Sequence, residues 1–239
     1  MATEYKKFKE RKELDASYST ANGVRLRINC HYKRGNPSLS ARIIPNIVPK
    51  LEDIGLEELE YLCDETDGLI LFIGPTGAGK STSLAAMVQH IALHKGGNIV
   101  TLEDPIEFIF TSEKGLIRQR QLGTDFHEFP AALRGVLRQD PNIIVVGEMR
   151  DLETIAAALT LAETGHLVFA TLHTPNAVQT VDRIVDVFPP FQQQQIRTQP
   201  FPLSSCHRRA EASTVRSRRS YRPARGTDQH YCRCKHHPR

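Results

Sequence analysis

Short runs of consecutive apolar residues recur through the middle of the chain, separated by longer segments typical of helices. The predicted strands are Leu69–Ile73, Asn98–Leu102, Ile143–Val146 and Leu167–Leu172. The predicted helices between them are Ser81–His94, Pro130–Leu137 and Leu152–Glu163. Strands that are buried on both faces have continuous apolar runs, and helical crossovers join parallel strands. Residues 67–199 are therefore predicted to form an α/β core around a mostly parallel sheet.

Near the start of the chain, apolar and polar residues alternate instead, as they do in half-buried strands. Val24–Tyr32 and Leu39–Ile44 are the predicted strands, and the charged residues 1–15 predict an exposed helix end. Two strands in about fifty residues make a thin domain, so residues 1–48 are interpreted as a partial N-terminal domain. Residues 49–66 are predicted to be a linker followed by an amphipathic helix over Leu56–Leu62.

The first strand of the core runs into a glycine-rich loop. Its residues are Gly74, Pro75, Thr76, Gly77, Ala78, Gly79, Lys80 and Ser81. Glycines allow successive backbone N–H groups to converge on phosphate oxygens, and the start of the following helix adds positive potential. In this pattern Lys80 contacts the phosphates and the Ser81 hydroxyl ligates Mg²⁺. With a strand before the loop and a helix after it, the pattern predicts a nucleoside triphosphate site.

The second and third strands end in carboxylates. Because the carboxyl ends of parallel strands meet at one edge of a sheet, these groups are expected to converge on the loop. Glu148 follows the third strand and is predicted to hold Mg²⁺, directly or through water. Glu107 is the candidate that polarises the attacking water, while Glu103 and Asp104 are assigned to the loop and the outer shell of the metal. The residues alone do not decide which of Glu103, Asp104 and Glu107 polarises the attacking water.

Two histidines flank the fourth strand. His173 at its end is predicted to sense the γ-phosphate, since an imidazole can donate to a phosphate oxygen; the alternative is a simple hydrogen-bonding role. His166 begins the same strand, ~23 Å away if the strand is straight. It is therefore not expected to share that role within one subunit.

Composition changes this picture only at the C-terminal end. Hydrophobic content of 40% is ordinary for a globular protein, and no apolar run approaches the ~20 residues that span a bilayer. Five cysteines without regular spacing favour a reducing compartment over a disulfide framework. The net charge of +4 arises from residues 199–239, which hold nine arginines and one lysine against Glu211 and Asp228.

Residues 200–239 form an aberrant basic tail, rich in Cys, His and Arg, that is predicted to be disordered. A nucleic-acid-binding arm is one interpretation, and a metal knuckle is another, although its candidate ligands are spaced more tightly than in usual zinc sites. Those ligands would be Cys232, Cys234, His236 and His237. The favoured interpretation is a one-base frameshift near Gln199, because Arg, Cys, His, Ser and Pro without periodicity are typical of out-of-frame translation.

Four motifs occur in an order that resembles the secretion and pilus ATPases. Gly74–Thr82 resembles their Walker A motif, Thr101–Phe108 their Asp box, Leu137–Asp151 their Walker B motif and Thr164–Thr174 their His box. Gly147–Asp151 and Val181–Pro190 are similar to the PilT-type retraction ATPases of type IV pili. The resemblance covers about residues 8–199. It implies a RecA-like P-loop ATPase core preceded by a small α+β, PAS-like domain whose first half is absent here.

The resemblance also implies roles for particular residues. Glu107 becomes the catalytic carboxylate and Glu148 the Walker B carboxylate, and Thr82 joins the residues that bind ATP. An arginine of the N-terminal domain is expected to reach the nucleotide of a neighbouring subunit. The candidates are Arg27, Arg34 and Arg42, of which Arg42 is favoured.

At the level of the whole protein, the resemblance implies a homo-hexamer that uses ATP and Mg²⁺ to power pilus retraction and twitching motility. It would lie in the cytoplasm, peripheral to the inner membrane, with the membrane platform of the pilus and the pilin machinery as partners and no specific nucleic acid. The nucleotide site is expected to be intact, but the printed polypeptide is not expected to form an active hexamer. The alternatives are a type II secretion or pilus-assembly ATPase and, in another class, a non-catalytic protein that binds nucleotide or uses its tail to bind nucleic acid.

Overall fold

The structure is a computed structural model that describes residues 2–45, 47–191, 193 and 203–206. The described chain divides into two compact units. The first contains the residues up to Val48 together with Glu107–Ile109, and the second begins at Pro49 and contains the remaining described residues.

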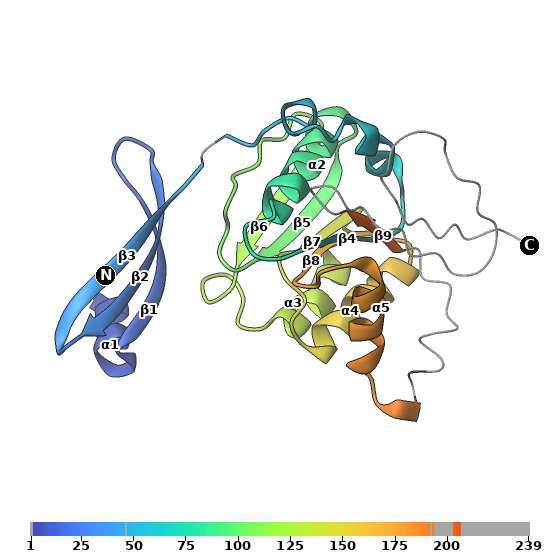
Figure 1. The fold of residues 1–239 in the computed structure, drawn as a ribbon. Coiled ribbons are helices and arrows are strands. Elements are labelled where there is room, and N and C mark those ends of the chain that lie inside the picture. The colour runs from blue at the N-terminus through green and yellow to red at the C-terminus, as the bar shows by residue number, and fades with distance from the viewer. Residues whose placement is uncertain (1, 46, 192, 194–202, 207–239) are drawn as a thin grey trace, which may run out of the picture. The chain divides into compact units, whose positions relative to one another are not determined.

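The first unit is one helix and a three-stranded antiparallel sheet in the order β1-β2-β3 (Figure 1). Its elements are α1 (Ala2–Arg11), β1 (Glu13–Ser19), β2 (Arg25–Lys33) and β3 (Asn36–Ile44). Arg34 and Gly35 join β2 to β3 with φ of 51° and 81°. Positive φ at both positions is the requirement of a type I′ turn, which suits the twist of a hairpin. Phe8 of α1 stacks on Tyr32 of β2 with ring centroids 5.1 Å apart, which anchors the helix on the sheet.

The second unit is a parallel sheet in the order β6-β5-β7-β8-β4-β9. Its strands are β4 (Gly68–Ile73), β5 (Gly97–Glu103), β6 (Gly115–Gln121), β7 (Ile143–Val146), β8 (Leu167–Leu172) and β9 (Leu203–Cys206). Its helices are α2 (Lys80–His94), α3 (Phe129–Val136), α4 (Leu152–Glu163) and α5 (Ala177–Asp186). The predicted α/β class with a parallel core sheet and a small α+β N-terminal unit is therefore confirmed.

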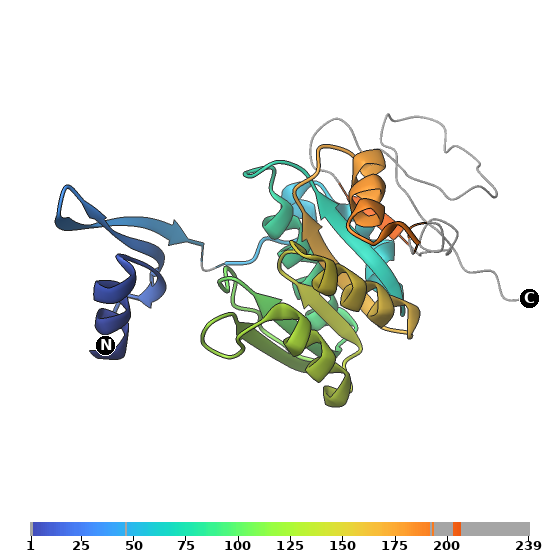
Figure 2. The same ribbon diagram turned by 90° about the horizontal axis from the view of Figure 1, so that it is seen from below.

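Helices cover both faces of this sheet, α2 on one face and α3, α4 and α5 on the other (Figures 1 and 2). Side chains of β4 alternate between two cores accordingly. Leu69, Leu71 and Ile73 pack with residues of α3, α4 and α5, whereas Ile70 and Phe72 pack with α2. This burial on both faces explains why β4 has no polar position.

The structure contains several elements that the apolar pattern did not predict. β1 was missed because it follows a charged run and only Leu14 and Ala16 along it are half-buried. β6 lies at the edge of the sheet, so Gly115–Gln121 has no need of a continuous apolar run. The predicted helix over Leu56–Leu62 is a 3₁₀ helix, Glu57–Asp64. α5 was also not predicted, and short 3₁₀ turns span Glu52–Ile54 and Leu137–Gln139.

Beyond residue 199 the structure places one strand, β9, whose backbone pairs in parallel with β4 from Leu69↔Leu203 to Phe72↔Cys206. The metal knuckle, the basic arm and the rest of the tail lie outside the described residues. Among the described residues, no helix has both the length and the hydropathy needed to cross a bilayer.

Cys63 gives a test of the packing between the 3₁₀ helix Glu57–Asp64 and α2. The thiol is 2% exposed, and its Sγ lies 4.0 Å from the carbonyl oxygen of Met87. Burial, reinforced by the negative charges of Asp64 and Glu60, raises the pKa of Cys63 to about 12. The folded protein therefore holds this thiol protonated at pH 8, where an unfolded chain begins to ionise it.

Because the thiolate is the reactive species, we expect Cys63 in the native chain at pH 8 to be alkylated on the order of a hundredfold or more slowly than in urea. Peptide mass spectrometry after timed iodoacetamide treatment measures this, with half-buried Cys30 as the internal comparison. Equal native and denatured rates at Cys63 would contradict the burial of this thiol between the 3₁₀ helix Glu57–Asp64 and α2.

Candidate nucleotide-binding site

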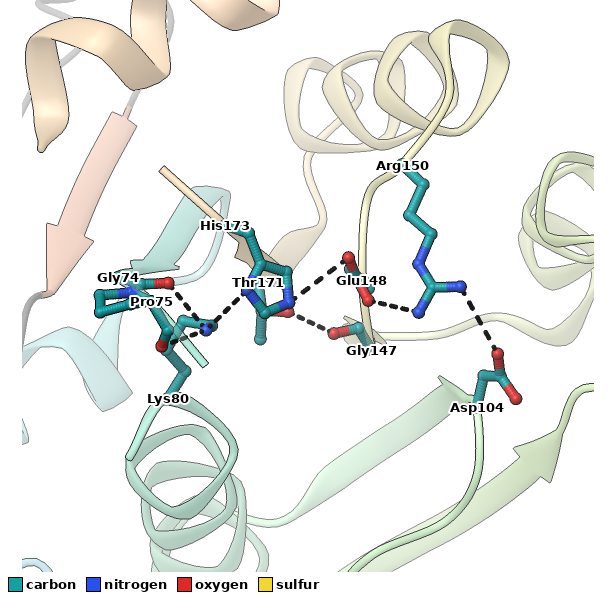
Figure 3. A network of polar contacts seen from close by, with 9 residues as sticks. All are labelled: Gly74, Pro75, Lys80, Asp104, Gly147, Glu148, Arg150, Thr171 and His173. Carbon is teal, nitrogen blue, oxygen red and sulfur yellow. Dashed lines mark hydrogen bonds and ion pairs between the residues drawn. The ribbon is translucent and has the colours of Figure 1, made fainter. Parts of the chain in front are cut away.

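The register of the parallel sheet determines which residues meet at its carboxyl edge. Ile73 of β4 lies opposite Leu172 of β8, and Leu102 of β5 lies opposite Val146 of β7. The chain segments that leave these strands therefore begin side by side. They contribute the glycine-rich loop, His173, the Asp104 loop and Glu148 (Figure 3).

The glycine-rich loop connects β4 to α2, which begins at Lys80. Gly74, Gly77 and Gly79 have φ of 140°, 83° and 88°. A side chain would strain each of these conformations, so glycine is required for the path of the loop. α2 is 15 residues long, and the N–H groups of its first turn have no partner within the helix, which makes this end suitable for an anion.

Lys80 folds back over this loop. Its Nζ donates to the carbonyl oxygens of Gly74 at 2.9 Å and Pro75 at 3.0 Å, and lies 3.2 Å from Nδ1 of His173. An ammonium group is a donor only, so His173 accepts at Nδ1 and its neutral ring holds the proton at Nε2. Burial lowers the pKa of Lys80, and the nearby charge of Glu148 partly opposes that shift.

Glu148 lies on the other side of His173. Its Oε1 is 3.5 Å from Nε2 of His173, and its Oε2 is 2.7 Å from Nη2 of Arg150. Burial opposes ionisation of this carboxyl group. The hydrogen bond and charge of Arg150, helped by the charge of Lys80, outweigh that effect and lower the pKa of Glu148. The group is therefore a carboxylate at neutral pH.

Arg150 lies within the motif Gly147–Asp151, and the sequence alone predicts no role for it. In the structure its guanidinium also approaches Asp104, with Nη1 4.0 Å from Oδ2. The available signal was a cation two residues beyond a strand-end carboxylate. Only the fold shows that the same cation also meets the carboxylate after β5.

Backbone contacts hold these strand ends together. Gly147 N donates to the carbonyl oxygen of Leu102 at 2.8 Å, and Met149 N donates to that of Thr171 at 3.2 Å. The Thr171 hydroxyl donates to the carbonyl oxygen of Gly147. A Cβ at position 147 would lie 3.1 Å from the carbonyl oxygen of Leu102, so glycine permits the close approach of β5 and β7.

The remaining candidates lie elsewhere. The Glu103 carboxylate accepts from the Thr101 hydroxyl at 2.7 Å and from Gln119 Nε2 at 3.1 Å. His166 lies at the start of β8, where its Nδ1 is 3.1 Å from the carbonyl oxygen of Leu161. Glu107 belongs to the first unit, where its carbonyl oxygen accepts from Arg25 Nη1 at 2.8 Å. Its catalytic role stays a prediction.

Arg42 also belongs to the first unit. It lies on β3 directly opposite Arg27 of β2, so the two arginines share one face of the antiparallel sheet. Both are exposed. Two like charges placed opposite each other disfavour the sheet slightly, and an anion bound at this face would relieve that repulsion.

The donor set at the loop suits Mg²⁺. Ser81 is exposed at the start of α2, and Glu148 supplies a carboxylate, so both candidate ligands are oxygen donors. Within the described ranges, no group of three or more His, Cys, Asp or Glu side chains could hold a metal by itself. Protein sites usually hold Mg²⁺ through one or two side chains together with substrate phosphates and water.

These features define a P-loop nucleotide-binding protein. A family model described as "Type II/IV secretion system protein" matches residues 39–198, and the chain belongs to this family. It is 47% identical over 194 residues to the type IV pilus retraction ATPase PilT of Pseudomonas aeruginosa, covering 81% of this chain and 56% of that protein.

Two further comparisons agree. The chain is 46% identical over 192 residues to a twitching motility protein of Neisseria gonorrhoeae, covering 80% of this chain and 51% of that one. The crystal structure of the pilus retraction motor PilT with bound ADP matches with a TM-score of 0.81 and 43% identity, over 86% of this chain and 61% of that one. The chain thus spans about half the length of the curated relatives it matches.

Lys80 is the residue of this site whose loss is easiest to interpret. We expect Lys80→Ala to weaken binding of a fluorescent ATP analogue roughly 10- to 100-fold, since it removes charged hydrogen bonds to phosphate. Lys33→Ala, at an exposed position of β2, serves as the matched control. Fluorescence titration with circular dichroism as the check of folding measures the change. Equal affinities for Lys80→Ala and Lys33→Ala would show that nucleotide binds elsewhere.

Proposed function

We propose that this chain carries the nucleotide site of an ATPase that acts as the motor subunit of a hexameric ring and powers type IV pilus retraction, an activity that the printed polypeptide by itself is not expected to show. The observation that supports it most directly is the row of side chains along the carboxyl edge of the sheet, which runs from Lys80 through His173 and Glu148 to Arg150 (Figure 3). It supports the proposal because the cation proposed to bind phosphate, the residue proposed to sense the γ-phosphate and the carboxylate proposed to hold the metal are neighbours in this row. The similarity to retraction ATPases favours retraction over secretion or pilus assembly.

The mechanism divides the work among the residues of this chain. Lys80 and the loop N–H groups bind the β- and γ-phosphates, and Ser81 and Glu148 hold the metal. When bound, Mg²⁺ neutralises charge that develops on the phosphoryl group. Glu107 accepts a proton from the attacking water, and His173, freed at Nδ1 when Lys80 turns to the phosphates, responds to the γ-phosphate. Arg42 of a neighbouring subunit supplies the cation that stabilises the transition state.

The proposed setting follows from the same family membership. The motor would lie in the cytoplasm, peripheral to the inner membrane, where it acts on the membrane platform of the pilus and on pilin. The competing function, nucleic-acid binding through residues 199–239, predicts an affinity that falls steeply with salt and disappears when those residues are removed.

Deletion of the gene in the organism that encodes it separates the candidate functions. Loss of a retraction motor should leave excess surface pili and abolish twitching, because assembled pilin is no longer withdrawn. Loss of an assembly motor should leave no pili. Electron microscopy and a surface-motility assay measure both, with complementation by the wild-type gene and by Glu107→Gln. Unchanged piliation, or full complementation by Glu107→Gln, would overturn the corresponding part of the proposal.

A mixing experiment tests the assignment of Arg42 to a neighbour's site. Lys80→Ala and Arg42→Ala are each expected to abolish twitching. When both are expressed in one cell, some interfaces join an intact Lys80 to an intact Arg42, so motility should partly return. If Arg42 served its own subunit, no intact site would form and the mixture would stay inactive. Lys33→Ala should retain motility by itself.

A further inference from the structure

Arg150 links the ends of two neighbouring strands of the core sheet. Its Nη2 lies 2.7 Å from Glu148 Oε2, after β7, and its Nη1 lies 4.0 Å from Asp104 Oδ2, after β5. Figure 3 shows the guanidinium between the two carboxylates, at the far end of the row from Lys80. The planar fork of arginine can face two carboxylates at once, which a lysine ammonium on a flexible stem does less well.

Exposure argues against a mainly stabilising role for this arrangement. The Arg150 side chain is 66% exposed, and those of Asp104 and Glu148 are 39% and 26% exposed. Ion pairs that are this open to water contribute little to the stability of a fold. The contact does, however, orient the Glu148 carboxylate. Its role is therefore better explained by the metal that this carboxylate is proposed to hold.

Both oxygens of Glu148 are engaged by this network. Arg150 contacts Oε2, and His173 faces Oε1 at 3.5 Å. The carboxylate is therefore held between two partners. If Arg150 were absent, the remaining cation near Glu148 would be Lys80, whose charge already acts on that carboxyl group. Glu148 would then be free to turn toward the phosphate-binding lysine and away from a metal.

We propose that Arg150 is a positioning residue for the metal–nucleotide complex: by bridging Glu148 to Asp104, it holds the Glu148 carboxylate where it can serve Mg²⁺ and keeps it away from Lys80. This inference rests on the proposed nucleotide function. Arg150 itself does not touch the reacting atoms. Its effect passes through Glu148, in the way that outer partners orient the ligands of a metal.

Binding of N-methylanthraniloyl-ADP to the full chain tests this proposal without any need for turnover. Fluorescence titrations in EDTA and at graded Mg²⁺ concentrations separate contacts to the nucleotide from contacts to the metal. We expect Arg150→Gln to raise the Mg²⁺ concentration for half-maximal enhancement of binding about 10- to 100-fold, the usual cost of losing an outer partner. Affinity in EDTA should change much less.

Two further variants make the result specific. Arg150→Lys retains the charge but not the fork and should give an intermediate Mg²⁺ requirement. Arg134→Gln is the matched control, because Arg134 is also 66% exposed and lies 3.9 Å from a carboxylate, that of Glu153, outside the site. It should behave as the wild type.

An unchanged Mg²⁺ requirement in Arg150→Gln would overturn the proposal, as would an equal shift in Arg134→Gln. If Arg150→Gln does not fold, Arg150→Lys decides the question by the same criterion. A wild-type chain whose ADP binding ignores Mg²⁺ would also overturn it. Binding that depends on Mg²⁺ and on Arg150, together with unchanged piliation after deletion of the gene, would instead support this inference and contradict the proposed function.

Discussion

The parallel pairing of β5, β7, β8 and β4 is the constraint on which the candidate site depends. Register fixes Leu102 opposite Val146, Val146 opposite Ala170 and Ile73 opposite Leu172. Four chain segments that are far apart in the sequence therefore leave the sheet at one edge. The pairing needs close approach at Gly147, where a Cβ would meet the backbone of β5. A shift of one residue in any pair would turn every side chain of that strand to the other face.

Charge alternates along this edge, so neighbouring ionisable groups attract rather than repel one another. Lys80 is positive, Glu148 negative, Arg150 positive and Asp104 negative, with neutral His173 between the first two. Each charge has an opposite neighbour, so no carboxylate faces another without a cation between them. The same arrangement is suited to nucleotide binding, because phosphates and a metal can replace the contacts of Lys80 and Glu148 without leaving a charge unpaired.

The elements that the sequence predicted well are those with the strongest burial. β4, β7 and β8 are buried at every position, and Thr171 of β8 is the one polar residue in these three strands. β1 and β6 lie at sheet edges and include exposed polar positions, and their pattern alone does not distinguish them from loops. The helix expected at Leu56–Leu62 is a 3₁₀ helix in the structure. The spacing of apolar side chains indicates which face of a helix is buried, but it does not indicate the hydrogen-bond pattern of the backbone.

The sequence by itself determined the α/β class, the phosphate loop and the chemical types at the strand ends, because these depend on local patterns of burial, glycine and charge. The tertiary structure decided which of those groups meet. It joined Lys80 to His173 and Glu103 to Gln119, placed His166 at the opposite end of β8, and gave Arg150 two carboxylate partners from different strands. Such contacts depend on strand order and register, which arise from packing across the whole sheet and leave no signal at the residues themselves.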